Sequence, residues 1–308
     1  MPIRRWKKLS ALIKPEAVYG TDPVPTGAAN YIQLSDAAFT PLAGDEEARN
    51  LMQPFLGHQG VFLTGDYGQF NFSVEIAGAG VAGTAPAFGP LLRSCGFAQV
   101  VSAGVDVQYD LIHDAFESSS LYYNSDGVKH VLLGMRGSVS LGFTPKRIPR
   151  FQFSMKGLLG TITDEALPVV TKTMWIDPVV VSKANTVMSL HGWTAIAESL
   201  NIDTGSQVVP RHLIGEESIE ITDRSVTGTA VVKAQSLATK DWFAIARAHT
   251  KAALALTHGT VAGNTVAIDS DAVQIGRPSE GQSDNIRNYS LPLMLTSLGT
   301  KELKITVK

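Results

Sequence analysis

The stretch "SSLYYNSDGVKHVLLGMRGSVSLGF", residues 119–143, indicates the fold class of this chain. Asp126 and Gly127 lie between the runs "SLYYN" and "VKHVLL". An Asp-Gly pair in that position is a strong signal for a two-residue hairpin turn, because both residues tolerate positive φ. After the turn, apolar and polar residues alternate, as in a strand with one buried face. The stretch therefore predicts two antiparallel strands.

The same alternation recurs along the chain, whereas helical spacing is scarce. Phe88, Leu91, Leu92 and Cys95 have the spacing of one short amphipathic helix that Gly96 closes. Further strands are predicted at residues 30–42, 69–77, 150–157, 227–234 and 288–296, a counterpart of the Asp-Gly hairpin at 252–268, and a second short helix at 240–249. We therefore predict a mainly β protein with two tandem antiparallel β-sandwich domains, each with a short flanking α-helix.

The order of these elements suggests a duplication. A shift of 155 residues carries Thr84 to Thr239 and Phe88 to Phe243, so that a strand again leads into a short helix. We predict an N-terminal domain with an N-terminal arm at 1–157, a linker at 158–184 and a second, similar domain at 185–308. The alternative is that any two β domains look alike at this level of detail.

Gly78, Gly80 and Gly83 form a G-x-G-x-x-G pattern, which raises the question of a dinucleotide site. The strand before such a site is covered on both faces and is apolar throughout, but residues 69–77 alternate. The first acidic residue after Gly83 is Asp106, too far along the chain for the ribose contact. We interpret the pattern as a glycine-rich loop that leaves an antiparallel strand. A dinucleotide-binding oxidoreductase is kept as an alternative.

No other motif supports catalysis or metal binding. The seven histidines lack the spacing of a metal site, and the cluster Asp106, Asp110, His113 and Asp114 has no nucleophile nearby. We therefore predict no catalytic residue, no cofactor and no metal, and expect that the chain is not an enzyme.

Composition narrows the functional classes. The net charge of −2 argues against a general nucleic-acid binder, which needs a concentrated basic face. Only 18% of residues are charged and 44% are hydrophobic, a balance that suits surfaces covered by other subunits. One cysteine, Cys95, fits a protein made in a reducing cytosol, and no stretch is long enough to span a membrane. In the N-terminal arm, Arg4, Arg5 and Trp6 are candidates for a clasp onto a neighbouring subunit.

The run "AGAGVAGTAPAFGPLLRSCG" (77–96) resembles a signature of the major tail tube proteins of long-tailed, siphovirus-like bacteriophages. The resemblance spans roughly residues 6–160. Further phrases follow in the same order: "IKPEAVYGTDPVPTGAANYIQLSD" (13–36), "ARNLMQPFLG" (48–57), "LLGMRGSVSLGF" and "RFQFSMKGLLG".

The resemblance implies a structural virion protein without catalysis, made and assembled in the bacterial host cytoplasm and located in the phage tail. It implies tail-tube-like domains that self-assemble into stacked rings around a hollow conduit, through which genomic DNA passes into the host without specific binding and without a membrane partner. Tape-measure, tail-terminator and distal tail proteins are the implied partners. If the chain carries two tube domains, three chains complete a pseudo-sixfold ring. If the second domain is decoration, six chains are needed.

Two further expectations follow from this resemblance. Gly78, Gly80 and Gly83, with Arg4, Arg5 and Trp6, are the residues that we expect to serve assembly, and strands that face the bore should be poor in Lys and Arg. The alternative is a related tail-tip or tail-terminator protein, which would stop at a single ring.

Overall fold

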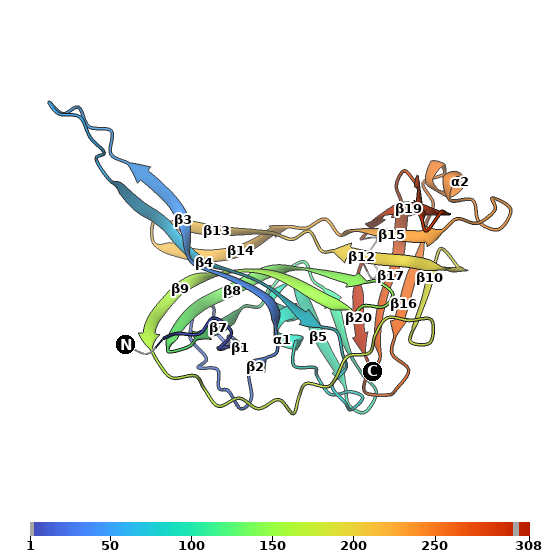
Figure 1. The fold of residues 1–308 in the computed structure, drawn as a ribbon, viewed down its shortest axis with the longest axis horizontal. Helices are drawn as coiled ribbons and strands as arrows, with labels where there is room; N and C mark the ends of the chain where they lie inside the picture. The colour runs from blue at the N-terminus through green and yellow to red at the C-terminus, as the bar shows by residue number, and fades with distance from the viewer. Residues whose placement is uncertain (1–2, 298–301) are drawn as a thin grey trace.

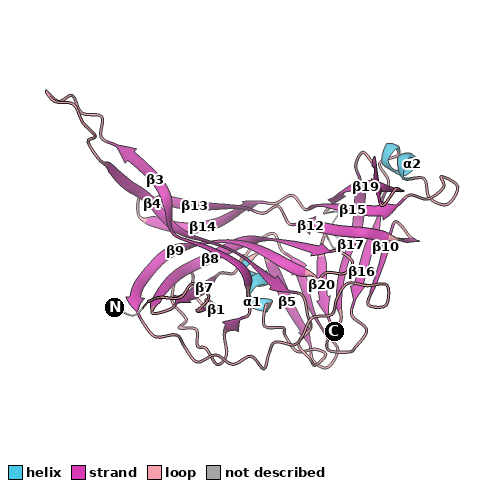
Figure 2. Ribbon diagram, viewed as in Figure 1, coloured by secondary structure: helices cyan, strands magenta, loops and turns pink. Residues whose placement is uncertain are grey.

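The computed structural model describes residues 3–297 and 302–308, and in this part antiparallel strands predominate (Figure 2). Eighteen strands belong to one hydrogen-bonded network, and two more form a separate hairpin. The prediction of a mainly β chain is confirmed. The two predicted helices are also confirmed, as α1 (Gly89–Ser94) and α2 (Trp242–Arg247).

The first half of the chain provides nine strands, which run in Figure 1 from blue to green. They are β1 (Leu9–Pro15), β2 (Tyr31–Ile32), β3 (Ser35–Ala48), β4 (Val61–Glu75), β5 (Phe97–Ser102), β6 (Asp106–Leu111), β7 (Ser119–Ser125), β8 (Val128–Phe143) and β9 (Arg150–Asp164). Their pairing order is β2-β1-β7-β8-β9-β4-β3. The β5–β6 hairpin is inserted between α1 and β7.

The second half provides the remaining strands. They are β10 (Thr186–Leu190), β11 (Trp193–Thr194), β12 (Ala197–Asp203), β13 (Gln207–Leu213), β14 (Glu216–Asp223), β15 (Thr227–Lys233), β16 (Lys251–His258), β17 (Val266–Ile275), β18 (Ser279–Ser283), β19 (Ile286–Leu295) and β20 (Lys304–Val307). Seven of them pair in the order β11-β10-β16-β17-β19-β15-β12. Residues 165–185 contain neither helix nor strand, and β9 continues past the expected boundary at residue 157.

The hairpin turn predicted at Asp126-Gly127 is confirmed. Ser125 pairs directly with Val128, and both turn residues have positive φ, +34° and +98°. In contrast, the strands predicted at residues 30–42 and 69–77 are longer than expected, and the interpretation of the segment between them as a loop is wrong. Here β3 extends to Ala48 and β4 begins at Val61, so most of this segment is a strand hairpin that projects from the body (Figure 1).

A common apolar core lies beneath the strands of both halves. Leu91, Leu92 and Cys95 of the α1 region are fully buried in it, as the helical spacing predicts. In the second half, Trp242 at the start of α2 is buried, and Asp241 caps this helix by accepting a hydrogen bond from the Ala244 N–H at 2.9 Å.

Two ladders join the halves. Strand β12 pairs with the last residues of β8, and β20 lies between β6 and β17. The first ladder creates a continuous sheet across the whole chain, in the order β3-β4-β9-β8-β12-β15-β19-β18.

Candidate functional site: a polar sheet face between two open edges

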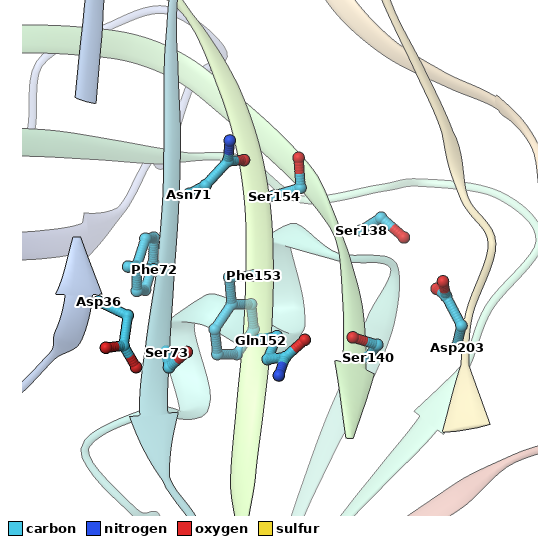
Figure 3. Close-up of a pocket in the computed structure, with 10 residues that line it drawn as sticks. All are labelled: Asp36, Asn71, Phe72, Ser73, Ser138, Ser140, Gln152, Phe153, Ser154 and Asp203. Atoms are coloured by element: carbon cyan, nitrogen blue, oxygen red, sulfur yellow. The ribbon is translucent and has the colours of Figure 1, made fainter. Parts of the chain in front are cut away.

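One face of the continuous sheet is lined by small polar side chains, and the other face packs on the core. Because side chains alternate along a strand, Phe72 and Phe153 are buried while their neighbours face outward. The outward residues shown in Figure 3 surround a hollow of about 320 Å³. They are Asp36 on β3, Asn71 and Ser73 on β4, Gln152 and Ser154 on β9, Ser138 and Ser140 on β8, and Asp203 on β12.

The same face continues into the second half of the chain. Asn201 on β12 pairs with Thr229 on β15, and Asp203 pairs with Thr227. The next hollow along the sheet includes these four residues. Hydroxyl and amide groups therefore cover this face across strands of both halves.

The charges at the margins of this face are mostly anionic or already paired. Asp36 and Asp203 contribute carboxylates. The Arg150 guanidinium lies 3.2 Å from the Asp36 carboxylate and 3.7 Å from that of Glu75. Lys156 donates a hydrogen bond to the Val208 carbonyl at 2.9 Å. Around the hollow of Figure 3 the face therefore presents neutral polar groups and carboxylates, and Arg150 and Lys156 have partners within the chain. Further along β15, Lys233 is exposed on the same face.

The β13–β14 hairpin forms one border of the polar face. It lies across β8, β9 and β4 and in Figure 1 runs along the top of these strands. The Ser206 N–H donates to the Ser138 hydroxyl at 3.2 Å, where the chain leaves β12 and crosses β8.

Arg136 on β8 fixes this hairpin to the first half. Its guanidinium is buried, lies 2.5 Å from the Glu220 carboxylate and donates to the Ile219 carbonyl at 2.8 Å. It also stacks on the Tyr19 ring at 4.8 Å, and the Tyr19 hydroxyl accepts from the Ile219 N–H at 2.6 Å. Burial raises the pKa of Tyr19, so this hydroxyl stays protonated. Charge-assisted bonds of this kind are stronger than neutral ones.

The continuous sheet ends in two open edges. Within the residues that the structure describes, β3 pairs only with β4 and β18 pairs only with β19. All five residues of β18 are exposed. An unpaired strand edge offers a row of N–H and C=O groups to another chain.

The outer part of the β3–β4 hairpin exposes large apolar side chains. The exposed fraction is 105% for Met52, 67% for Phe55, 102% for Leu56 and 57% for Phe62. Such a concentration on a projecting element is typical of a surface that another protein covers.

The glycine-rich loop packs against the second half of the chain. The Gly78 N–H donates to the Asn264 side-chain oxygen at 2.8 Å, and the Gly80 N–H donates to the Gly263 carbonyl at 2.9 Å. A Cβ at Gly78 would overlap the Gly263 carbonyl, and one at Gly83, where φ is +69°, would overlap the backbone of the β5–β6 turn. These glycines therefore allow close approach of backbone to backbone, and neither hydrogen-bonded amide is free for a phosphate.

The N-terminal arm is tied to the Asp126-Gly127 turn. Arg4 donates to the carbonyls of Ser125 and Asp126 at 2.5 and 3.1 Å, and the Arg5 N–H donates to the Asp126 carboxylate at 2.5 Å. Trp6, between these contacts and β1, has an exposed fraction of 85%. The arm thus holds a large aromatic side chain in the solvent.

Comparison with known proteins gives the family. The model of the family described as "Phage tail tube protein" matches residues 6–293, which is nearly the whole chain. The chain belongs to the phage tail tube protein family. No curated protein matches it. The tail tube family is a structural one of the phage virion, as the resemblance in the sequence implied.

Sequence reasoning missed the polar face of this tail tube protein. The signal was present, because Asn71, Ser73, Ser138, Ser140 and Gln152 occupy alternate positions in strands that the sequence predicts correctly. The alternation indicates that each strand has one solvent-exposed face, but it does not show that these faces lie side by side in one sheet.

Among the described residues, none of the helices has the length and apolar character needed to cross a bilayer.

Proposed function

We propose that this tail tube protein is a structural building block whose copies join edge to edge into rings, and that the rings stack into the hollow tube of the phage tail. The observation that carries the proposal is the continuous sheet with an open edge at each end, β3 and β18. A closed ring of such sheets leaves no edge unpaired.

In the proposed tube, the polar face lines the bore and genomic DNA passes through it into the host. Phosphates that approach a wall of hydroxyl, amide and carboxylate groups release few counterions and are not held, whereas a basic wall would retain the DNA. The protein then has no catalytic role. Its proposed site of assembly is the host cytoplasm, and the tape-measure, tail-terminator and distal tail proteins are its proposed partners.

Three copies in a pseudo-sixfold ring are the proposed stoichiometry. The matching pairing orders of the two halves support it, because each half then supplies one tube domain. The first is residues 1–157 together with the rest of β9 up to Asp164, the second is 185–308, and the remainder of 158–184 is the linker. We further propose that Trp6, positioned by Arg4 and Arg5, and the loop of Gly78, Gly80 and Gly83 contact the adjacent ring.

Negative-stain electron microscopy of the purified chain tests this proposal. We expect long hollow tubes of uniform diameter, formed by the chain alone or with its tape-measure protein. Rings that never stack would instead indicate the tail-tip or tail-terminator alternative. Monomers that stay monomeric at high concentration under both conditions would refute the proposal.

A further inference from the structure

The two halves can be aligned residue by residue from their hydrogen bonds. In the first half, the Ile76 N–H donates to the Pro149 carbonyl at 2.9 Å and closes the β4–β9 ladder. In the second half, the Ala234 N–H donates to the Arg287 carbonyl at 3.0 Å and closes the β15–β19 ladder in the same way. This match aligns β4 with β15 and β9 with β19.

The residue pairs of these ladders also align the strands next to them. Gly142 is opposite Arg150 and Gly281 is opposite Asn288, so the end of β8 corresponds to β18. Five residues earlier, Gly137 corresponds to Gly276, so that glycine recurs at both positions.

On the far side of β4 and β15 from these ladders, β3 corresponds to β12. Ala38 is opposite Asn71 and Asn201 is opposite Thr229, which makes Ala38 the counterpart of Asn201. Each of these two strands has a register shift near its start, between Ser35 and Ala38 in β3 and between Ala197 and Ser199 in β12.

The ladder between β12 and β8 therefore joins the two repeats through different edges. The second repeat contributes β12, and the first repeat contributes the end of β8, which is the counterpart of β18. Asn201 pairs with Gly142 and Asp203 pairs with Ser140. A Cβ at Gly142 would lie 2.8 Å from the Asn201 side-chain oxygen, so glycine permits the close approach. The corresponding joint for β3 and β18 is not made within the described part of the chain, and both strands remain open on that side.

We infer that β3 of one copy pairs antiparallel with β18 of the next copy, with Ala38 opposite Gly281 and Thr40 opposite Ser279. This inference rests on the proposed ring and names its interface. Pro41 follows Thr40 in β3, and Pro278 precedes Ser279, the first residue of β18. Both prolines lack an N–H, so the ladder ends at the same pair of positions on the two strands. Each copy gives one edge and receives one, which is the head-to-tail contact that closes a ring.

The projecting hairpin follows from the same correspondence. Strands β13 and β14 continue β12 and β15, and they lie across β8, which pairs with β12, and across its neighbour β9. The outer part of the β3–β4 hairpin is the counterpart of β13–β14, because it continues the inner residues of β3 and β4 that correspond to β12 and β15. It therefore lies across β18 and β19 of the next copy, the counterparts of β8 and β9. The exposed Phe62 on β4 then becomes covered, whereas Met52 and Phe55 lie in the loop beyond the ends of both strands.

Disulfide cross-linking tests the register. In a Thr40→Cys/Ser279→Cys variant, directly opposed residues of neighbouring copies lie about 4.5–5.5 Å apart between Cα atoms, within disulfide range. Cys95 is fully buried and stays out of the reaction. Mild oxidation of assembled tubes should produce covalent multimers on a non-reducing gel.

Two control variants make the result specific. Thr40→Cys/Ser283→Cys keeps the face and shifts the register by four residues, so it should produce no multimers. Ser140→Cys/Asp203→Cys places the pair at the joint within the chain and should form an internal disulfide without multimers. Multimers from the shifted pair, or their absence from the matched pair in well-formed tubes, would overturn the inference and leave the proposed tube intact.

An Ala38→Trp variant covers the case in which the cysteine variant does not assemble. Ala38 is exposed on the edge strand β3, so the monomer should fold with an unchanged melting temperature. The indole blocks the approach of Gly281, and tubes should be lost. A normal yield of tubes would overturn the inference, whereas a wild-type chain that forms no tubes would refute the proposed function itself.

Discussion

Placing lysines on the polar face should turn a wall that releases DNA into one that retains it. Gln152 and Ser154 are exposed residues of β9 on this face, two positions apart. Replacing both with lysine leaves the core untouched, and exposed substitutions of this kind usually change stability by less than about 0.5 kcal/mol. Tubes of Gln152→Lys/Ser154→Lys should therefore form as well as wild-type tubes.

The size of the effect follows from counterion release. Two lysines in each of three copies put about six new ammonium groups around one ring, and neutralising about six phosphates gives a slope of roughly −5 in log K against log salt. Raising the salt concentration from about 50 to 200 mM should then weaken DNA retention about 10³-fold. Wild-type tubes should show almost no retention and almost no salt dependence.

Co-sedimentation of tubes with DNA measures the retention. Short linear duplexes can enter a bore from its ends, but closed circular plasmid DNA cannot, so only linear DNA should be retained by the lysine variant. The matched variant Gln152→Glu/Ser154→Glu should retain neither form. Equal binding of linear and circular DNA, or no binding to intact lysine-variant tubes, would refute the assignment of this face to the bore.

Further predictions concern stability and assembly. Gly83→Val should prevent folding of the monomer, because the new Cβ would overlap the backbone of the β5–β6 turn. At Gly80 a new Cβ has only Ile176 within 4 Å, but φ is +85°, so Gly80→Ala should fold with a loss of about 1–2 kcal/mol in stability and a lower tube yield; circular dichroism and tube yield separate the two effects. Burial lowers the pKa of His258, so the folded state keeps this ring neutral while the unfolded state takes up a proton below about pH 6.5. Stability should therefore be lost as the pH falls through this range, less steeply in His258→Gln, and urea titrations at several pH values check the sign. Arg136→Ala removes the ion pair to Glu220, whose side chain is one third exposed, and the hydrogen bond to the Ile219 carbonyl. It should destabilise the chain by about 1–3 kcal/mol, with faster proteolysis within residues 207–223; equal protease resistance would count against this role of Arg136. Trp6→Ala should leave the melting temperature unchanged and lower the tube yield, since the side chain has few contacts in the monomer.

Local features of the fold could be predicted from the sequence. The turn at Asp126-Gly127 needs only two residues that accept positive φ between apolar runs, and the α1 helix needs only the spacing of its buried side chains. Each of these signals depends on residues that are close together in the sequence, so it can be recognised without knowing which distant segments pack together.

The outer hairpin and the joints could not be predicted in this way. Residues 42–48 of β3 have no apolar alternation because neither face of the projecting strand is buried, so the segment looks like a loop. The pairing of Asn201 with Gly142 joins strands far apart in the chain, and no local pattern specifies it. Likewise, the glycine motif shows that the backbone must be free to turn, but not that Gly80 meets Gly263.

Cryo-electron microscopy of assembled tubes tests the central claim most directly. We predict rings of three copies in which β3 of each copy pairs with β18 of the next and Asn71, Ser140 and Gln152 face the bore. Rings of six copies with the second half of each chain on the outside, or a bore lined by another face of the sheet, would contradict the account.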